Sequence, residues 1–570
     1  MMKMPNTVRL KTPFEQNPNN WDIYPRPQMV RDSFFPIGGD WKLYAVNQGG
    51  KTSLGTICVP FPPESILSGI ERTLEKNEHY IYEKSFSVPA DFLHEKTLLH
   101  FGAVDQIAIV FLNDVLIGAH IGGYLPFSFD VTSQIKIGEN TIVVKVFDTL
   151  DPDIPYGKQS KKRGGMWYTP ISGIWQSVWL ESMPKDAIRS IRLTPTLHDI
   201  TIETEGGTEE KHLEIETPDG IRKYRFTGNK TTLSMENPSL WTPENPYLYH
   251  FTLTSGKDTV RSYFALRTVS VQNINGKPYI TLNGKPYFFH GLLDQGYFSD
   301  GIYLPASPEG YRFDVETMKK LGFNTLRKHI KIEPDIFYYE CDRLGMIVFQ
   351  DMVNSGKYHF IMDTALPTLG LKKGITHKAS ARRKEIFENS VKETLSLLYN
   401  HPCVCYYTIF NEGWGQYDAD RIYAECKTAD PSRIFDSTSG WFEEKESDVK
   451  SEHVYFKPIK LTPSKKPLVL SEFGGYSCKI EGHSFNLDKN YGYRFFKDRE
   501  SFMNALETLY REEIIPALSS GLCASILTQV SDVEDETNGL LTYDRQVLKV
   551  DEKRMKNIAK DLQTAFEKHI

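Results

Sequence analysis

Short apolar runs separated by Gly, Asn and Asp dominate the first half of the chain. Such runs lie at 79–89, 96–104, 107–123 and 140–150. Strand-length runs at this spacing predict an all-β sandwich, jelly-roll-like in type, over residues 20–183. A second strand-rich stretch over 184–273 is about the size of an immunoglobulin-like domain, and it predicts a second, smaller β-sandwich.

The pattern changes after Pro278, where apolar β-rich runs begin to alternate with amphipathic segments. This alternation is typical of a parallel β/α fold. Eight strand candidates over 274–570 predict a (β/α)₈ TIM barrel, although the sixth is weakly marked. The candidate strands lie at 287–293, 323–329, 346–352, 404–411, 433–439, 453–456, 468–473 and 523–529. The expected helices span 315–321, 334–344, 384–399, 419–428, 501–515 and 552–569.

Composition narrows the classes of function. Apolar residues make up 40% and charged residues 25% of the chain, and the net charge of −6 is spread along it. This mix is that of a folded protein without a basic stripe, so we expect no nucleic-acid partner. No run approaches the ~20 apolar residues of a membrane span, and the first twenty residues lack a secretory signal. The seven scattered cysteines are interpreted as reduced and mostly buried, so a cytoplasmic protein is expected.

Two glutamates follow apolar barrel strands directly. Glu412 comes after VCYYTIFN, and Glu472 comes after PLVLS. Barrel enzymes place their chemistry at the carboxyl ends of strands, where a half-desolvated carboxylate can have a tuned pKa. One such glutamate could equally be a loop acid, but two at strands four and seven favour a pair that flanks a substrate. The distance between the carboxylates would decide between retention and inversion of a glycosidic centre.

The two glutamates lie in the segments HPCVCYYTIFNEGWG and PLVLSEFGG, and further segments precede them along the chain. In this order the segments resemble glycoside hydrolase family 2, the family of β-galactosidases, β-glucuronidases and β-mannosidases. The resemblance covers nearly the whole chain and implies an exo-acting, retaining β-glycosidase without a cofactor. It implies that Glu472 is the nucleophile and Glu412 the acid/base. The segments are RPQMVRDSFFPIGGDWKLY, TICVPFPPES, GIWQSVWLE, KPYITLNGKPYFFHGLL, FNTLRKHIKIEPDIFYYECDRLGMIVFQDM, HPCVCYYTIFNEGWG and PLVLSEFGG.

The resemblance also implies residues that hold the sugar. Asn411 matches the residue that hydrogen-bonds the sugar 2-hydroxyl, and Tyr455 matches the tyrosine that orients the nucleophile. Arg327 and His329 lie where the family holds the nucleophile and the sugar, and Trp441 is a candidate stacking platform. Each of three residues also has an interpretation without a functional role. Tyr455 could be a core tyrosine, Arg327 a helix-capping arginine and His329 a surface histidine.

The sequence departs from the family pattern where the sugar should bind. The usual Asn-Arg-His entry to the barrel is replaced by a segment in which Asp294 and Gln295 are predicted to contact substrate. The acid that usually precedes the closing Trp, here Trp167, is missing or is supplied by Asp151 or Asp153.

The last barrel loop reads TNGLL, without the Asn-x-Lys pair with which glucuronidases bind a uronate. Lys328 and Lys331 are possible substitutes, since a buried carboxylate needs a cation, although lysines on such a loop are usually solvated. We rank β-galactosidase first, with a β-glucuronidase, a β-galactofuranosidase or an α-L-arabinofuranosidase as alternatives.

Two further classes stay open, namely a non-catalytic carbohydrate-binding protein and an endo-acting hydrolase. An endo-acting enzyme would have an open cleft, whereas a sandwich domain against the barrel mouth predicts a blind pocket. The acidic run at 532–536 is expected to be a solvated loop, so no metal is predicted. The expected partner is a carbohydrate, and a homo-oligomer is possible because the family is often oligomeric.

Overall fold

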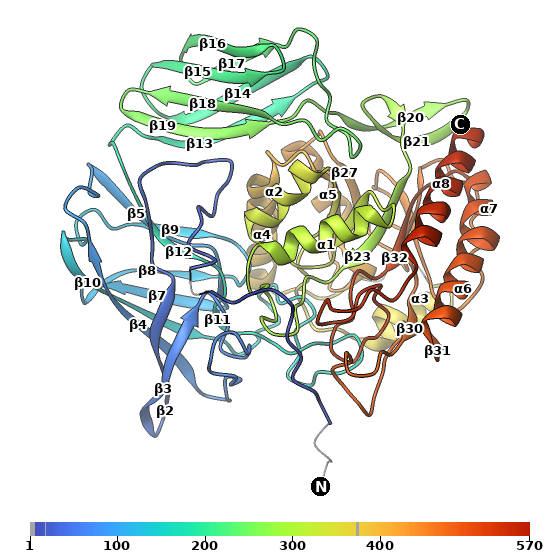
Figure 1. Cartoon of the computed structure of the whole chain (residues 1–570), viewed down its shortest axis with the longest axis horizontal. Helices are drawn as coiled ribbons and strands as arrows, with labels where there is room; N and C mark the ends of the chain where they lie inside the picture. Colours follow the sequence, from blue (N-terminus) through green and yellow to red (C-terminus); the bar gives the residue numbers. More distant parts are fainter. Residues whose placement is uncertain (1–5, 18, 372–375) are drawn as a thin grey trace.

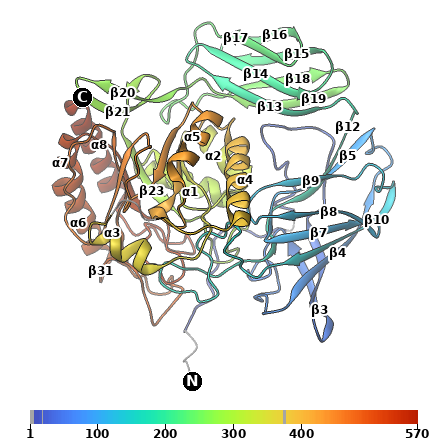
Figure 2. The ribbon, with the colours of Figure 1, turned by 180° about the vertical axis from the view of Figure 1, so that it is seen from behind.

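The computed structural model describes residues 6–17, 19–371 and 376–570. Figure 1 shows two β-sandwiches and a barrel, with the first sandwich in blue to cyan, the second in green and the barrel in yellow to red. Figure 2 shows from behind that the second sandwich lies above the junction of the other two units. The fold class predicted from the sequence, two β-sandwiches followed by a TIM barrel, is therefore confirmed.

The first sandwich packs a six-stranded antiparallel sheet, in the order β3-β2-β4-β10-β7-β8, against a four-stranded sheet in the order β1-β12-β5-β9. Alternate side chains of β4, β7 and β10 are buried, as expected when one face of each strand meets the core. The strands are β1 Phe34–Pro36, β2 Gly39–Asn47, β3 Gly50–Val59, β4 His79–Val88, β5 Lys96–Phe101, β6 Val104–Asp105, β7 Ile107–Leu112, β8 Val115–Ile121, β9 Phe127–Asp130, β10 Gly138–Phe147, β11 Gly173–Ile174 and β12 Val178–Met183.

The second sandwich packs the sheet β13-β14-β17 against the sheet β16-β15-β18-β19. A small sheet, β20-β21-β22, then leads into the barrel. The strands are β13 Ile188–Pro195, β14 Asp199–Gly206, β15 Glu210–Thr217, β16 Gly220–Thr227, β17 Lys230–Ser234, β18 Tyr249–Ser255, β19 Asp258–Phe264, β20 Val269–Ile274, β21 Lys277–Leu282 and β22 Lys285–Pro286.

Eight parallel strands form the barrel, including the weakly marked sixth. Seven of them are buried along almost their whole length, because helices cover the outside and side chains fill the inside. The strands are β23 Phe289–Asp294, β24 Thr325–Lys328, β25 Ile347–Asp351, β26 Val404–Phe410, β27 Ile434–Thr438, β28 Lys450–Val454, β29 Leu468–Gly474 and β32 Leu522–Thr528.

The barrel helices lie on the outer face of this sheet (Figure 1). Side chains cap three of them, because Ser380, Asp498 and Asp551 accept hydrogen bonds from the amides of Arg383, Ser501 and Arg554. The segments are α1 Glu309–Lys320, α2 Asp335–Leu344, α3 Leu366–Thr368, α4 Ala381–Leu398, α5 Ala419–Ala429, α6 Arg499–Leu509, α7 Ile515–Ala517 and α8 Glu552–His569, with the short pair β30 Tyr476–Cys478 and β31 Arg494–Phe496.

The barrel sheet has two ends, β27 and β28, and over the described residues no backbone ladder joins them. Side chains connect them instead. Ser451 donates from Oγ to the carbonyl of Thr438 over 3.5 Å, and the amide of Gly440 donates to Ser451 Oγ over 3.3 Å. We refer to this junction between β27 and β28 as the seam.

All seven cysteines are free thiols, and six of them are buried, as the sequence predicted. Over the described ranges, no helix has the length and apolar character needed to cross a membrane.

Candidate active site

The two predicted glutamates lie at the mouth of the barrel. Glu472 belongs to β29, and Glu412 follows β26 in the short turn Asn411–Gly413. Glu412 has a left-handed backbone, with φ of 50°. This conformation costs a non-glycine residue on the order of 1 kcal/mol, and the amide of Glu412 is held by a hydrogen bond to Ser439 Oγ, 3.2 Å away. Strain of this kind is concentrated at functional sites.

The gap between the two glutamates is short. One carboxylate oxygen of Glu412, one of Glu472 and a ring nitrogen of His453 all lie within 4.8 Å of one another. Retaining glycosidases place their two carboxyl groups about 5–5.5 Å apart, and inverting enzymes about 6.5–9.5 Å, to admit a water. The same three residues could also hold a metal ion, although the sequence predicts none.

His453, on β28, contacts both glutamates. Its Nδ1 lies 2.9 Å from Oε1 of Glu412 and 3.5 Å from Oε2 of Glu472. Arg327 Nη1 lies 3.3 Å from Nε2 of His453. A guanidinium only donates, so Nε2 accepts and the hydrogen of a neutral ring is on Nδ1, which faces the glutamates. No role was predicted for His453 from the sequence. The signal that could have identified it is its position two residues before Tyr455 in the predicted sixth strand, 453–456, where both side chains would lie on one face.

Glu472 is held as a carboxylate. Arg327 donates from Nη1 to Oε1 over 2.9 Å, and Tyr455 donates its hydroxyl to Oε2 over 2.7 Å. Burial alone would raise the pKa of Glu472, but the charges of His453, Arg327 and His329 and the hydrogen bond from Tyr455 outweigh it and lower the pKa to about 2. Glu472 is therefore ionised at neutral pH, as a nucleophile must be.

Removing the imidazole in a His453→Gln variant is expected to raise the pKa of Glu472 from about 2 towards its ordinary 4.5. Only the ionised carboxylate attacks, so activity is lost as the pH falls through this pKa. The acid limb of kcat/KM should therefore move to higher pH in the variant. A pH profile on an aryl glycoside, with circular dichroism to detect unfolding, measures it, and an unmoved acid limb would contradict this electrostatic role.

Arg327 is fully buried at the centre of the site. Besides Glu472, it contacts Asp351 through Nε over 3.0 Å and Asn411 Oδ1 through Nη2 over 2.8 Å. Asp351 also lies 2.8 Å from Nδ1 of His329. The structure therefore brings together Arg327, His329, Asn411 and both glutamates. The sequence did not single out Asp351, although it is the last residue of β25, where polar residues are informative.

The predicted aromatic residues lie beside the same centre. Tyr455 donates to Glu472, lies 2.8 Å from Thr528 Oγ1, and stacks on Tyr493 with ring centroids 3.9 Å apart. Trp441 meets the ring of His453 edge to face at 5.9 Å. Tyr455 is thus more than a core tyrosine, whereas the stacking of Trp441 on a sugar stays a prediction.

Asp294 and Gln295 differ in their surroundings. Asp294 accepts hydrogen bonds from Lys328 over 2.6 Å and from the amide of Gly296 over 2.9 Å, so both of its oxygens have partners. The side-chain oxygen of Gln295 is buried without a hydrogen-bond partner among the described residues. Contacts of both residues with substrate stay predictions.

Lys328 and Lys331, the cations considered for a uronate, are both buried and both contact Glu333 Oε1 over 2.9 Å. Lys331 also donates to the carbonyls of Gly296 and Tyr303. Burial lowers the pKa of Lys331 to about 8, in spite of the Glu333 charge. These lysines are therefore neither solvated nor unpaired, because they neutralise Asp294 and Glu333 inside the protein.

We expect Glu333→Gln to destabilise the protein by about 3–5 kcal/mol, because two buried ammonium groups then share the single carboxylate of Asp294. The melting temperature and the denaturant midpoint measure this loss. Glu309→Gln is the control, because Glu309 is 66% exposed beside Arg312 and should change stability by less than ~0.5 kcal/mol. Equal stabilities of the two variants would contradict the pairing.

The first sandwich covers part of the barrel mouth. Trp167 packs edge to face against Trp414, with centroids 5.1 Å apart, and against Tyr358 at 5.3 Å. Tyr156 joins the same cluster. Asp151 and Asp153, considered as sources of the missing acid, instead pair with Arg382 at the start of α4.

The acidic run Asp532–Glu536 is buried, so its interpretation as a solvated loop was wrong. The first sandwich covers it, because Glu534 accepts a hydrogen bond from the amide of Thr169 over 2.9 Å and pairs with Arg163 at 3.3 Å. Tyr168 donates its hydroxyl to Glu536.

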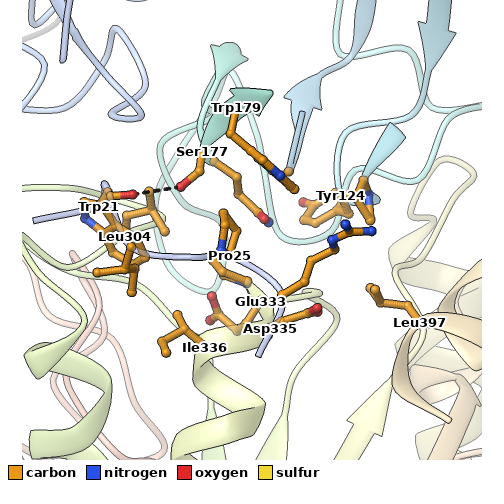
Figure 3. Close-up of a pocket in the computed structure, with 16 residues that line it drawn as sticks. Trp21, Pro25, Tyr124, Ser177, Trp179, Leu304, Glu333, Asp335, Ile336 and Leu397 are labelled. Carbon is orange, nitrogen blue, oxygen red and sulfur yellow. Dashed lines mark hydrogen bonds between the residues drawn. The ribbon is translucent and has the colours of Figure 1, made fainter. Parts of the chain in front are cut away.

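A separate apolar pocket lies between the first sandwich and helix α2 (Figure 3). Its cavity volume is about 50 Å³, and none of the nine predicted site residues lines it. The labelled side chains come from both units, and Ser177 donates a hydrogen bond to the carbonyl of Trp21 over 3.4 Å. The site described above therefore lies elsewhere, at the barrel mouth.

Three models of one protein family match the chain. The sugar-binding domain of family 2 glycosyl hydrolases matches residues 64–184, a second domain of the same family matches 185–267, and its TIM barrel domain matches 273–482.

Curated relatives share this family. The chain is 28% identical over 366 residues to a β-galactosidase of Thermoanaerobacter pseudethanolicus, covering 59% of this chain and 45% of that protein. It is 25% identical over 429 residues to a β-glucuronidase of Felis catus, covering 66% of this chain and 62% of that protein. The match thus spans less than half of the β-galactosidase.

Solved structures show the same fold over almost the whole chain. A β-D-glucuronidase from Dictyoglomus thermophilum has a TM-score of 0.74 at 18% identity, covering 95% of this chain and 98% of that one. A β-galacturonidase from Eisenbergiella tayi has a TM-score of 0.68 at 18% identity, covering 94% and 98%. At this identity the likeness shows the fold alone.

Proposed function

The chain belongs to glycoside hydrolase family 2, and from that membership we propose that it is an exo-acting, retaining β-glycosidase that releases terminal sugars from oligosaccharides or glycosides. The observation that carries the proposal is the 4.8 Å limit on the gap between Glu412 and Glu472. A gap this short is nearer to the separation of the carboxyl groups in retaining enzymes than to that in inverting enzymes, and so supports direct attack by one carboxylate. We also propose the domain division 20–183, 184–273 and 274–570.

In the proposed mechanism, Glu472 attacks the anomeric carbon while Glu412 gives its proton to the departing glycosidic oxygen. A covalent glycosyl-enzyme forms and the aglycone leaves as an alcohol. Glu412, now a carboxylate, takes a proton from water, which attacks the same carbon and releases Glu472. The two inversions give a product with the configuration of the substrate.

The contacts of Asn411 support its proposed role at the sugar 2-hydroxyl. Its Oδ1 accepts hydrogen bonds from Arg327 and from Ser439 Oγ, 2.9 Å away. This fixes the amide orientation, so that the two N–H groups of Asn411 face away from Arg327 and can donate to a substrate hydroxyl. Arg327 thereby positions the nucleophile and the sugar-binding amide together.

The exo mode is supported by the first sandwich, since Trp167 and Tyr168 pack on loops of the barrel mouth. A polysaccharide crossing the mouth would meet this sandwich, whereas a single terminal sugar needs only a blind pocket. An endo-acting hydrolase is therefore the weaker proposal.

We rank β-galactosidase activity first, with a β-glucuronidase or a furanosidase as alternatives, because the curated relatives include both β-galactosidases and β-glucuronidases. The test is hydrolysis of a panel of nitrophenyl β-pyranosides and furanosides, with the anomer of the first product followed by proton NMR. We expect turnover with net retention. Net inversion would refute the mechanism, and sugar binding without any turnover would favour the non-catalytic carbohydrate-binding class.

A further inference from the structure

The acidic run between β32 and α8 contains four acids, and Glu536 is the one that lies beside the residues that hold Glu472. Asp532 also has one oxygen, Oδ2, without a hydrogen-bond partner, but that atom is fully buried. Asp532 accepts from Lys549 over 2.5 Å and from the amide of Gly539 over 2.9 Å. Glu534 is held by Thr169 and Arg163, as described above. Asp535 accepts from Asn486 over 2.7 Å. These three acids fasten the loop to its surroundings, which explains their burial.

Only one of the two carboxylate oxygens of Glu536 accepts hydrogen bonds from the described residues. Its Oε2 accepts hydrogen bonds from Tyr168 and from Gln529 Nε2, 3.1 Å away, while its Oε1 accepts none from the described residues. The loop is fixed here, because the backbone of Tyr491 pairs with Glu536 in a parallel bridge. Glu536 therefore presents one oxygen of a firmly held carboxylate.

Glu536 lies close to the same site. Gln529, which holds Glu536, directly follows Thr528, and Thr528 contacts the Tyr455 hydroxyl that binds Glu472. The charges also interact, because burial and then the Glu472 charge are among the causes that raise the pKa of Glu536. Glu536 and Glu472 are thus close enough for their charges to interact.

Most of the cations near Glu472 and Glu536 already form ion pairs with other carboxylates. Lys328 and Lys331 pair with Asp294 and Glu333, and Arg163 pairs with Glu534. Lys158, from the first sandwich, has no carboxylate within 4.0 Å among the described ion pairs, and its charge acts on both Glu536 and His329. The charge of Lys158 therefore acts on Glu536 without a direct ion pair. A uronate placed here would add a third carboxylate beside Glu472 and Glu536, where burial makes like charges costly.

We propose that Glu536 selects the glycone: its free oxygen accepts hydrogen bonds from the hydroxyl groups of a neutral sugar, and its charge excludes uronic acids. The inference rests on the proposed glycosidase activity and narrows its substrate class. This inference also distinguishes the chain from a uronidase. In a uronidase the residue at this position would have to donate hydrogen bonds to the substrate carboxylate, whereas Glu536 can only accept them.

The test compares nitrophenyl glycosides that differ only at carbon 6, namely β-D-galactoside with β-D-galacturonide and β-D-glucoside with β-D-glucuronide, together with neutral furanosides. We expect kcat/KM for the preferred neutral sugar to exceed that of its uronide by at least ~100-fold. Glu536→Gln should lower turnover of the neutral sugar by roughly 10- to 100-fold, since it weakens a charged hydrogen bond, and should raise the ratio of uronide to neutral turnover. Glu534→Gln, in the same loop, is the matched control and should leave that ratio unchanged.

A wild-type protein that hydrolyses a uronide as well as the neutral partner overturns the inference, while retention in that reaction would still support the proposed function. In that case Lys158→Met should remove the uronide activity, which would assign the carboxylate to Lys158. If no glycoside is hydrolysed, the proposed function fails. Thermal shifts with free D-galactose, D-glucose and their uronic acids then decide the binding class, and stabilisation by a uronate alone overturns the inference.

Discussion

Glu472→Ala is expected to lose nearly all turnover of aryl β-glycosides, with kcat reduced on the order of 10⁴- to 10⁶-fold, a range typical of lost nucleophiles. Sodium azide should restore part of the rate, because it enters the space left by the carboxylate and attacks the anomeric carbon from the same side. With one displacement instead of two, the product should be the α-glycosyl azide. Product analysis by NMR measures this outcome.

The control for this experiment is Glu481→Ala, because Glu481 is an exposed glutamate in the loop that follows Glu472. It should keep full activity and show no response to azide. Full activity of Glu472→Ala, or rescue that gives the β-azide, would refute the assignment of Glu472 as the nucleophile.

The loss of hydrolysis rate in Glu412→Ala should depend on the leaving group. An alkyl or sugar aglycone needs a proton to depart, so its hydrolysis should fall by about 10²- to 10⁴-fold, the usual contribution of a general acid. A dinitrophenyl aglycone needs no proton, so it should still leave in a rapid burst as the glycosyl-enzyme accumulates, because the variant lacks the base that activates water for the second step. Stopped-flow absorbance distinguishes these two cases.

Azide should rescue this second variant with the opposite stereochemistry. Glu472 is still present, so the glycosyl-enzyme forms, and azide then replaces water to give the β-glycosyl azide. The two variants thus act as controls for one another. The same azide anomer from both would contradict the division of roles between Glu412 and Glu472.

The sequence predicted the features that depend on local pattern. Periodicity identified the two sandwiches and the barrel, and strand-end positions identified Glu412 and Glu472 as the candidate catalytic pair. The structure places Arg327, His329, Asn411 and Tyr455 around them, because parallel strands bring their carboxyl ends to one rim. Their roles remain predictions that the variants above test.

The features that the sequence did not reveal depend on contacts between distant segments. Lys328 and the acidic run at 532–536 were expected to be solvated, since charged residues usually are. They are buried because Glu333 and Asp294 neutralise Lys328, and because Arg163 and Tyr168 of the first sandwich cover the run. His453 was missed for a similar reason, since its two partners come from β29 and from the turn after β26.

The seam between β27 and β28 bears on the stereochemistry of the proposed reaction. Glu412 follows β26 and Glu472 belongs to β29, so each stands one strand in from the seam. Their separation thus depends on the width of this junction, which His453 and Ser451 hold with side chains, as well as on the backbone ladder that joins β26 to β29 the other way round the barrel. Widening the junction by about 2–3 Å would bring the carboxylates into the range of inverting enzymes. If the proposed mechanism holds, the closure of the barrel at this seam therefore contributes to the choice between the two anomeric outcomes, and a wider seam could change that outcome without replacement of either glutamate.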